Sequence, residues 1–299
     1  MTTNIKKNVS FHIMIIPSVL LLIIYSYIPI IGGLVMAFKK YVPALGFVRS
    51  KWVGLDNFIY VFTTPDFSRA FFNTLLIASL KIVTGSVVSI IFALLLNEVG
   101  VTFVKRSLQT IVYLPYFISW VLLGGIIIDI LSPSNGIVNQ FLGLFGVEPI
   151  FFLGSNKWFP FVLVITNIWK EFGWGTILYL AAIAGIDPTL YEVSLMDGAG
   201  RWKQTIHITI PGMITTIVLI ATLNLGNILN GGFDQVFNLY SPVVLQSGDI
   251  IDTLVYRLGI EGAQFSIATT AGLFKSVISC ILIITSYKLA YRFAGYKIF

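Results

Sequence analysis

Two apolar segments of the sequence carry polar side chains at helical spacing. The residues are Asn167, Lys170, Glu171 and Trp174 in the first segment and Asn224 and Asn227 in the second. Spacings of three and four residues place each set on one face of a helix. Amides donate and accept hydrogen bonds, as sugar hydroxyls require, and an indole offers a flat surface to a sugar ring. Because such groups are costly in an apolar setting unless they line water or find partners, we predict a shared cavity that forms a substrate path. Structural hydrogen bonds between helices are the alternative explanation.

Residues that carry enzymatic chemistry are few and dispersed. The two histidines, His12 and His207, lie far apart in the chain, and no catalytic set is expected to converge on them. Cys280 is the single cysteine and lies in an apolar run, so neither an internal disulfide nor a paired-ligand metal site is expected. The chain lacks a G-x-x-x-x-G-K-[ST] phosphate loop. We therefore predict a protein that is not an enzyme and that binds no metal or cofactor.

A charged stretch separates the two apolar segments. Asp187 precedes Pro188, a common arrangement of N-cap and first helical position, which predicts a short helix over residues 188–196. Gly198 and Gly200 are expected to end this helix, and Pro211 to open the next segment. The stretch has the character of an amphipathic helix that lies across membrane helices and offers a contact surface to another protein.

The composition is that of an integral membrane protein. The chain has 299 residues, of which 57% are hydrophobic and 11% charged, with a mean hydropathy of +0.90; soluble domains carry about 25% charge.

Six segments of the chain qualify or nearly qualify as membrane spans, since a helix needs about 20 apolar residues to cross a bilayer. They are Phe11–Phe38, Ala70–Leu96, Leu108–Leu131, Trp158–Ala184, Pro211–Gly231 and Phe265–Phe293. The basic residues form no stripe with interleaved aromatics, so nucleic acid is not an expected partner.

Six spans place both termini on one side of the membrane. Basic residues are slightly more numerous on that side, which favours cytoplasmic termini. We expect the apolar stretch near the N-terminus to be an uncleaved first span. The predicted organisation is an all-α protein: residues 1–68 form the first transmembrane helix and an external loop, and residues 69–299 form a five-helix core with a cytoplasmic loop at 185–211.

This cytoplasmic loop resembles one in the permeases of bacterial binding-protein-dependent ABC importers. That family carries the pattern E-A-A, three residues, G, nine residues, I-x-L-P. Here Glu192 is followed by Gly198 at the family's spacing, and Ile208 to Pro211 close the pattern. The departures are Val193 and Ser194 in place of the two alanines, and Ile210 in place of leucine.

The resemblance covers nearly the whole chain. The segment at 52–58 is similar to the family's V-G-L-x-N-F, and Trp169 with Gly173 is similar to the W-x-x-x-G of sugar permeases. The residues at 169–174 and 184–188 are most similar to a Gram-positive group that imports oligosaccharides cut from polysaccharides. The segment at 223–228 resembles the stretch that contacts sugar in maltose-type permeases. The resemblance therefore implies a type I ABC importer permease fold in the bacterial cell membrane.

The resemblance also implies partners. These are a second permease, two ATPase subunits that bind ATP and Mg, an extracellular solute-binding lipoprotein, membrane lipid and an oligosaccharide. It assigns the coupling to the ATPase to Glu192, Asp197, Gly198, Ala199 and Pro211. Lys81, Lys170 and Lys275 lie within spans and suggest that the oligosaccharide is acidic. The alternative function is that of an ion-coupled secondary transporter of a small polar solute, in which these lysines and Glu171 would be the coupling groups.

Overall fold

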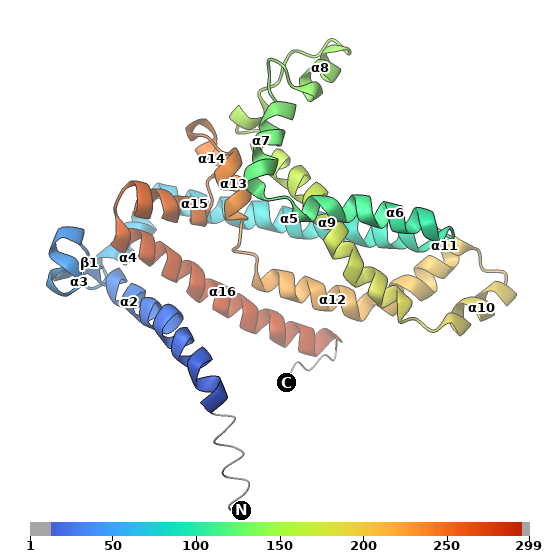
Figure 1. Ribbon diagram of the computed structural model, residues 1–299, viewed down its shortest axis with the longest axis horizontal. Coiled ribbons are helices and arrows are strands. Elements are labelled where there is room, and N and C mark those ends of the chain that lie inside the picture. Colours follow the sequence, from blue (N-terminus) through green and yellow to red (C-terminus); the bar gives the residue numbers. More distant parts are fainter. Residues whose placement is uncertain (1–12, 295–299) are drawn as a thin grey trace, which may run out of the picture. The chain divides into compact units, whose positions relative to one another are not determined.

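The computed structural model describes residues 13–294 (Figure 1). Lys6, Lys7 and His12, which the sequence analysis considered, lie outside the described residues. The chain divides into two compact units, one of residues 13–67 and 254–274, the other of residues 68–253 and 275–294. The described residues are mostly helical, as the composition predicts.

The first unit joins an apolar helix to a small hairpin. Its helices and strands are Ile13–Ala37, which includes η1 (Ile23–Tyr27) and α2 (Ile28–Ala37), then β1 (Lys39–Lys40), η2 (Pro43–Leu45), α3 (Gly46–Arg49), β2 (Lys51–Trp52), α4 (Asp56–Thr63), η7 (Arg257–Glu261) and the start of α16 (Phe265–Ala294). The strands pair antiparallel. Buried Asn57 donates to the carbonyl oxygens of Ala37 (2.7 Å) and Lys39 (2.9 Å), so this one amide fastens α4 to the end of the apolar helix.

The second unit contains the helices on which the predicted functional residues lie. They are α5 (Pro65–Asn97, whose first three residues belong to the first unit), α6 (Thr102–Tyr113), η3 (Leu114–Phe117), α7 (Trp120–Ile130), α8 (Ile137–Gly143), η4 (Phe152–Gly154), α9 (Phe159–Ala184), α10 (Pro188–Met196), α11 (Arg201–Gln204), η5 (Thr205–Thr209), α12 (Ile210–Gly226), α13 (Phe233–Leu239), η6 (Pro242–Val244), α14 (Leu245–Gly248), α15 (Ile251–Tyr256, shared between the units) and the rest of α16. Its core is an apolar cluster that includes Ile77, Leu123, Phe159, Leu163 and Val236.

The structure corrects the predicted third span. Residues 108–131 are not one helix, because α6 with η3 and α7 are bent by 101° at the break between them. Buried Pro115 lies in the first turn of η3 and has no backbone N–H to donate. Ser119 then caps α7 by accepting from the N–H of Leu122 at 3.4 Å. Two local signals, a proline and a serine cap, therefore interrupt a segment that hydropathy reads as continuous.

The predicted start of the fifth span is also wrong. The helix runs unbroken from Arg201 to Gly226, so Pro211 lies inside it rather than opening it. The π-helical turn η5 precedes the proline, and the N–H of Ile210 reaches the carbonyl of Thr205. Wider turns of this kind let a helix pass a residue that cannot donate.

Four of the described helices are long and apolar enough to cross a membrane, or five if the bent pair forms one span. They are Ile13–Ala37, Pro65–Asn97, Arg201–Gly226 and Phe265–Leu289. The predicted fourth span corresponds to α9, a 26-residue helix that carries Lys170 and Glu171 and is not among these four. The chain is thus a helical membrane protein with several candidate spans.

Buried Asn139 organises the segment between α7 and α9. Its amide nitrogen donates to the carbonyls of Ser132 (3.0 Å) and Ile150 (3.0 Å), and its oxygen accepts from the N–H of Ile150 at 2.8 Å. A single side chain therefore ties both ends of α8 together, and apolar side chains such as Phe141 and Phe145 remain exposed around it.

Replacing Asn139 with Ala should loosen this segment. The N–H of Ile150 would lose its partner, and the carbonyls of Ser132 and Ile150 would each lose one of two donors, so we expect a local loss of about 2 kcal/mol. Hydrogen exchange of residues 131–151 in the purified protein should then accelerate about tenfold or more. Asn135→Ala, at an exposed position in the same segment, is the matched control. Equal exchange in the two variants would contradict the role given to Asn139.

Candidate functional site

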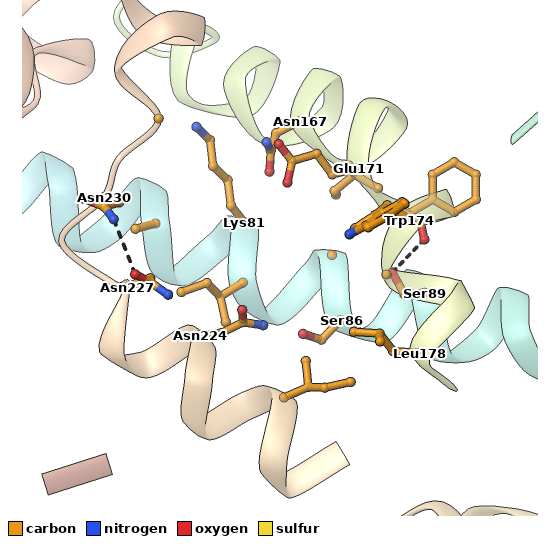
Figure 2. Close-up of a pocket in the computed structure, with 18 of the residues that line it drawn as sticks. Lys81, Ser86, Ser89, Asn167, Glu171, Trp174, Leu178, Asn224, Asn227 and Asn230 are labelled. Carbon is orange, nitrogen blue, oxygen red and sulfur yellow. Dashed lines mark hydrogen bonds between the residues drawn. The ribbon is translucent and has the colours of Figure 1, made fainter. Parts of the chain in front are cut away.

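A pocket of about 430 Å³ lies within the second unit (Figure 2). Side chains from α5, α9 and α12, and from the non-helical segment that follows α12, line it. The polar or aromatic residues among them are Lys81, Ser86, Ser89, Asn167, Glu171, Phe172, Trp174, Tyr179, Asn224, Asn227 and Asn230. The pocket thus combines amides, hydroxyls, one ammonium, one carboxylate and an indole.

The structure brings together five of the six residues predicted for a substrate path. Asn167, Glu171, Trp174, Asn224 and Asn227 all line the pocket. Within the part of the chain that the structure describes, the side chains of Asn167, Glu171 and Asn224 form no hydrogen bond and no ion pair. The structural alternative would require hydrogen bonds across helices, and these three side chains form none among the described residues.

The sequence analysis missed the contribution of α5 to the pocket. Lys81, Gly85, Ser86 and Ser89 stand at i, i+4, i+5 and i+8 and line one side. Two hydroxyls and an ammonium on one face of an apolar span are the same kind of signal that identified α9. The spacing could therefore have revealed this face.

Lys170 does not line the pocket. Its side chain is buried, its Nζ donates to the carbonyl of Tyr116 at 2.6 Å, and the ammonium lies 5.2 Å from the Tyr116 ring and 5.6 Å from the Trp120 ring. It therefore holds the break between η3 and α7 against α9.

The break is connected to the pocket through aromatic stacking. The rings of Tyr116 and Trp174 are nearly parallel, with an interplanar angle of 6° and centroids 4.7 Å apart. At the residue before Trp174, a Cβ on Gly173 would lie 2.3 Å from the carbonyl oxygen of Val112, so only glycine permits this approach of α9 to α6. The Trp174 indole that lines the pocket is thus held in place by Tyr116, which lies at the bend in the third predicted span.

The end of α12 forms another wall. The helix ends at Gly226, so Asn227 is its C-cap rather than a residue of the predicted helical stripe. The N–H of Asn230 donates to the carbonyl of Asn227 at 2.8 Å, and the Lys81 Nζ on α5 donates to the carbonyl of Gly231 at 2.8 Å. Figure 2 shows the Asn227 and Asn230 side chains adjacent at this corner. Lys81 therefore ties α5 to the non-helical segment.

Lys275 is paired inside the chain. Its Nζ lies 2.6 Å from a carboxylate oxygen of Asp252. The sequence analysis left its partner open, and the structure supplies an acid of the same chain.

The predicted short helix at 188–196 is confirmed. α10 covers Pro188–Met196, and the carboxylate of the N-cap Asp187 accepts from the N–H of Thr189 at 2.9 Å, which holds the pKa of this carboxyl below its usual value. Gly198 follows the C-cap Asp197 with φ +74°, and the N–H of Ala199 donates to the carbonyl of Ser194 at 2.9 Å. This is a Schellman motif, in which the left-handed position favours glycine.

Two polar contacts fasten α10 to the start of the following helix. The hydroxyls of Tyr191 and Thr209 share a hydrogen bond of 3.0 Å, and the Nε2 of Gln204 donates to the Ser194 hydroxyl at 2.9 Å. The neighbouring surface is exposed and mixed in character. It comprises the acids Glu192 and Asp197, with Leu195, Met196 and Trp202 at 64%, 88% and 77% exposure. Large apolar side chains beside acids are typical of a protein contact surface.

No cluster that could hold a metal ion occurs in residues 13–294. His207 is exposed, and its Nδ1 lies 3.0 Å from the carbonyl of Lys203. The described part of the chain presents a polar pocket and, at the end of α10, an exposed surface of mixed character.

Comparisons with known proteins agree with this description. Residues 85–294 match the family described as "Binding-protein-dependent transport system inner membrane component". Protein LplB of Bacillus subtilis is 41% identical over 97% of this chain and 91% of its own length. The polygalacturonan/rhamnogalacturonan transport system permease protein YteP of Bacillus subtilis is 40% identical over 94% of this chain and 88% of its own. The crystal structure of a bacterial alginate ABC transporter, in complex with an alginate pentasaccharide-bound periplasmic protein, contains a chain that superposes with a TM-score of 0.90. That chain is 37% identical, and the match covers 100% of this chain and 99% of the other.

Replacing Lys170 with Met should destabilise the protein. Methionine fills similar volume but leaves the partly buried Tyr116 carbonyl without a donor, so we expect the free energy of unfolding to fall by about 2 kcal/mol. The measurement is thermal unfolding of the purified protein in detergent. Lys157→Met is the control, since the Lys157 ammonium is exposed and lies 5.9 Å from the Trp158 ring. Equal melting temperatures for the two variants would show that Lys170 does not secure the break.

Proposed function

Because the chain belongs to the inner membrane components of binding-protein-dependent transport systems, we propose that it forms, with a second permease, the path by which an oligosaccharide enters the cell. The observation that carries this proposal is the pocket, where Asn167 and Asn224 line a common space beside Lys81 and Glu171 and form no side-chain hydrogen bond among the described residues. Unpaired polar groups at membrane depth are costly, so their retention favours a polar ligand.

The proposed membrane arrangement has six spans with cytoplasmic termini. The bent pair of α6 and α7 supplies the third span and α9 the fourth. The two charges of α9 explain why hydropathy undervalues it: Lys170 is paired with a carbonyl, and Glu171 lines the pocket. Neither charge would face lipid.

An acidic oligosaccharide is the proposed substrate class. One relative is named for polygalacturonan and rhamnogalacturonan transport, and the similar structure belongs to an alginate transporter. Of the three lysines that suggested acidity from the sequence, Lys81 lines the pocket, whereas Lys170 and Lys275 bind a carbonyl and a carboxylate elsewhere. In the ion-coupled alternative these two lysines would be coupling groups, and their partners within the chain argue against that role.

The proposed protein partners follow from the exposed surface at the end of α10. α10 and the surface around Gly198 would dock to an ATPase subunit that binds ATP and Mg, and a solute-binding lipoprotein would deliver the sugar from outside. Glu192, Asp197, Gly198 and Ala199 belong to the end of α10, while Pro211 lies within the following helix and would act on the geometry of that helix. The contacts of Gln204 and Thr209 would make α10 and this helix move together.

Changes at the end of α10 should uncouple transport from ATP hydrolysis. Gly198→Ala strains the left-handed position by about 1 kcal/mol, and Glu192→Lys reverses the charge of the contact surface. We expect both variants to insert normally and to lose most uptake, as measured in proteoliposomes with the complete complex. Gly200→Ala is the control for Gly198, because Gly200 has φ −71° and open space around it. Wild-type uptake by Gly198→Ala and Glu192→Lys would exclude this docking site.

Truncation of the pocket amides should impair uptake without dismantling the complex. The two variants are Asn224→Ala and Asn227→Ala. Asn224→Ala is the sharper of the two, because the Asn224 side chain makes no hydrogen bond among the described residues, whereas the Asn227 side chain donates to the carbonyl of Leu223 at 3.2 Å. We expect uptake to fall about tenfold or more in each variant, since each lost hydrogen bond to a sugar hydroxyl weakens transport. ATP hydrolysis stimulated by the lipoprotein should largely persist.

The control for this experiment is Asn135→Ala, which removes an exposed amide outside the pocket. Normal uptake by both pocket variants would show that these amides are not part of the path. Dissociation of the complex would show that they are packing residues.

A further inference from the structure

The small hairpin of the first unit, residues 38–53, concentrates positive charge. It contains no acid, and its basic residues are Lys39, Lys40, Arg49 and Lys51. Lys39 is used within the hairpin, since its Nζ donates to the carbonyl of Phe47 at 3.0 Å and lies 5.1 Å from the Phe47 ring. The other three side chains are exposed and form no ion pair or hydrogen bond with the described residues. The hairpin therefore presents three cations that the described chain does not neutralise.

Two of these cations lie directly opposite each other. β1 and β2 pair antiparallel with Lys40 across from Lys51. Side chains in such positions have Cβ atoms about 4.5–5.5 Å apart, and like charges there destabilise the strand pair. The loop between the strands is held by the Ser50 hydroxyl, which donates to the carbonyl of Gly46 at 2.7 Å and accepts from the N–H of Val42 at 3.1 Å. The fold thus keeps two ammonium groups close together although they repel, and an anion between them would replace repulsion with attraction.

The position of the hairpin in the chain places these charges at the level of lipid headgroups. The hairpin directly follows the apolar helix Ile13–Ala37 (Figure 1). The 25 residues of this helix extend for about 37 Å, whereas a bilayer has about 30 Å of hydrocarbon and about 5–8 Å of headgroups on each face. Lys40 is three residues beyond Ala37, so its Cα lies at most about 11 Å from the end of the helix. The paired lysines therefore start within or next to the headgroup layer.

An exposed indole supports this depth. Trp52, the residue after Lys51, is 59% exposed and stacks on Phe38, with ring centroids 5.7 Å apart and an interplanar angle of 9°. Tryptophan is enriched at membrane–water interfaces, where its ring lies at the level of the headgroups. The aromatic pair at the base of the hairpin and the two lysines beside it therefore fit the apolar and the charged side of one interface.

We propose that the hairpin binds the headgroup of an anionic membrane lipid, with Lys40 and Lys51 holding its phosphate from the two strands. Basic residues at the membrane surface attract anionic lipids in this way. In the proposed arrangement with cytoplasmic termini the hairpin is external, where short loops carry fewer basic residues, so its charge calls for a partner there. An acidic protein surface would match the charge but would account neither for the depth nor for the exposed Trp52. The inference goes beyond the proposed function, since it requires no sugar in the pocket.

The test follows hydrogen exchange of residues 38–53 in lipid nanodiscs. The complete complex is reconstituted either in phosphatidylcholine alone or in equal parts of phosphatidylcholine and phosphatidylglycerol. In the wild type, we expect the hairpin to exchange about fivefold or more slowly with phosphatidylglycerol, the scale of one basic residue at an anionic surface. Residues 187–200, around α10, are the internal control and should exchange equally in the two lipids.

Lys51→Gln gives the sharpest readout, because its effect should change sign with the lipid. In phosphatidylcholine it removes the repulsion across the strands, so the hairpin should exchange more slowly than in the wild type. With phosphatidylglycerol it removes one of the two groups that hold the phosphate, so the hairpin should exchange faster than in the wild type. Lys40→Gln should give the same result from the other strand. Lys51→Arg keeps the charge and is the matched control, which should behave as the wild type does.

Several outcomes would overturn the lipid site. One is equal exchange of the wild-type hairpin in the two lipids, and another is a change in Lys51→Gln that is the same in both, since the lysine would then act only within the hairpin. Inorganic phosphate added to the phosphatidylcholine nanodiscs should give no protection, and protection by it would indicate a site for soluble anions. Protection by the solute-binding lipoprotein but not by phosphatidylglycerol would identify the basic surface as a protein contact. All these readouts are independent of sugar uptake.

Discussion

Polar atoms placed at the depth of a lipid bilayer must find a partner in the protein or face a polar cavity, and this constraint orders the second unit of the structure. Lys170 satisfies it by binding the Tyr116 carbonyl, and Lys275 by pairing with Asp252. Asn167 and Asn224 satisfy it differently, because they line a pocket and bind nothing else in the described chain. The paired groups thus fix where helices break and meet, and the unpaired amides face the pocket.

The same constraint explains what periodicity could and could not predict. Caps and glycines act within a few residues, so the helix at 188–196 and its end at Gly198 follow from local sequence. Asn167 and Lys170 share one predicted face, yet only Asn167 lines the pocket. The difference arises from Tyr116, which is 54 residues away in sequence. Spacing identifies a face, but the neighbour across from each position decides its role.

Errors in the predicted spans have local causes of a different kind. Hydropathy is insensitive to backbone donors, so it could not detect the break at Pro115 or the passage of the helix through Pro211. It likewise could not place the end of α12 at Gly226, where a Cβ would lie 2.9 Å from the Ile283 side chain on α16. The contribution of α5 to the pocket was within reach, because Lys81, Ser86 and Ser89 lie on one face.

Under the proposed coupling to an ATPase, the helix from Arg201 to Gly226 would act as a lever. One end is bonded to α10 through Gln204 and Thr209, and the other end carries Asn224 into the pocket wall. At 1.5 Å per residue, Thr209 and Asn224 lie about 23 Å apart along the axis. A tilt of about 10° with its pivot near Thr209 would therefore displace Asn224 by about 4 Å, enough to reshape the pocket without unwinding any turn. The π-helical turn at Thr205–Thr209 includes this pivot residue. The proposed tilt would therefore start at the stretch of this helix whose hydrogen bonds join residues five apart instead of four.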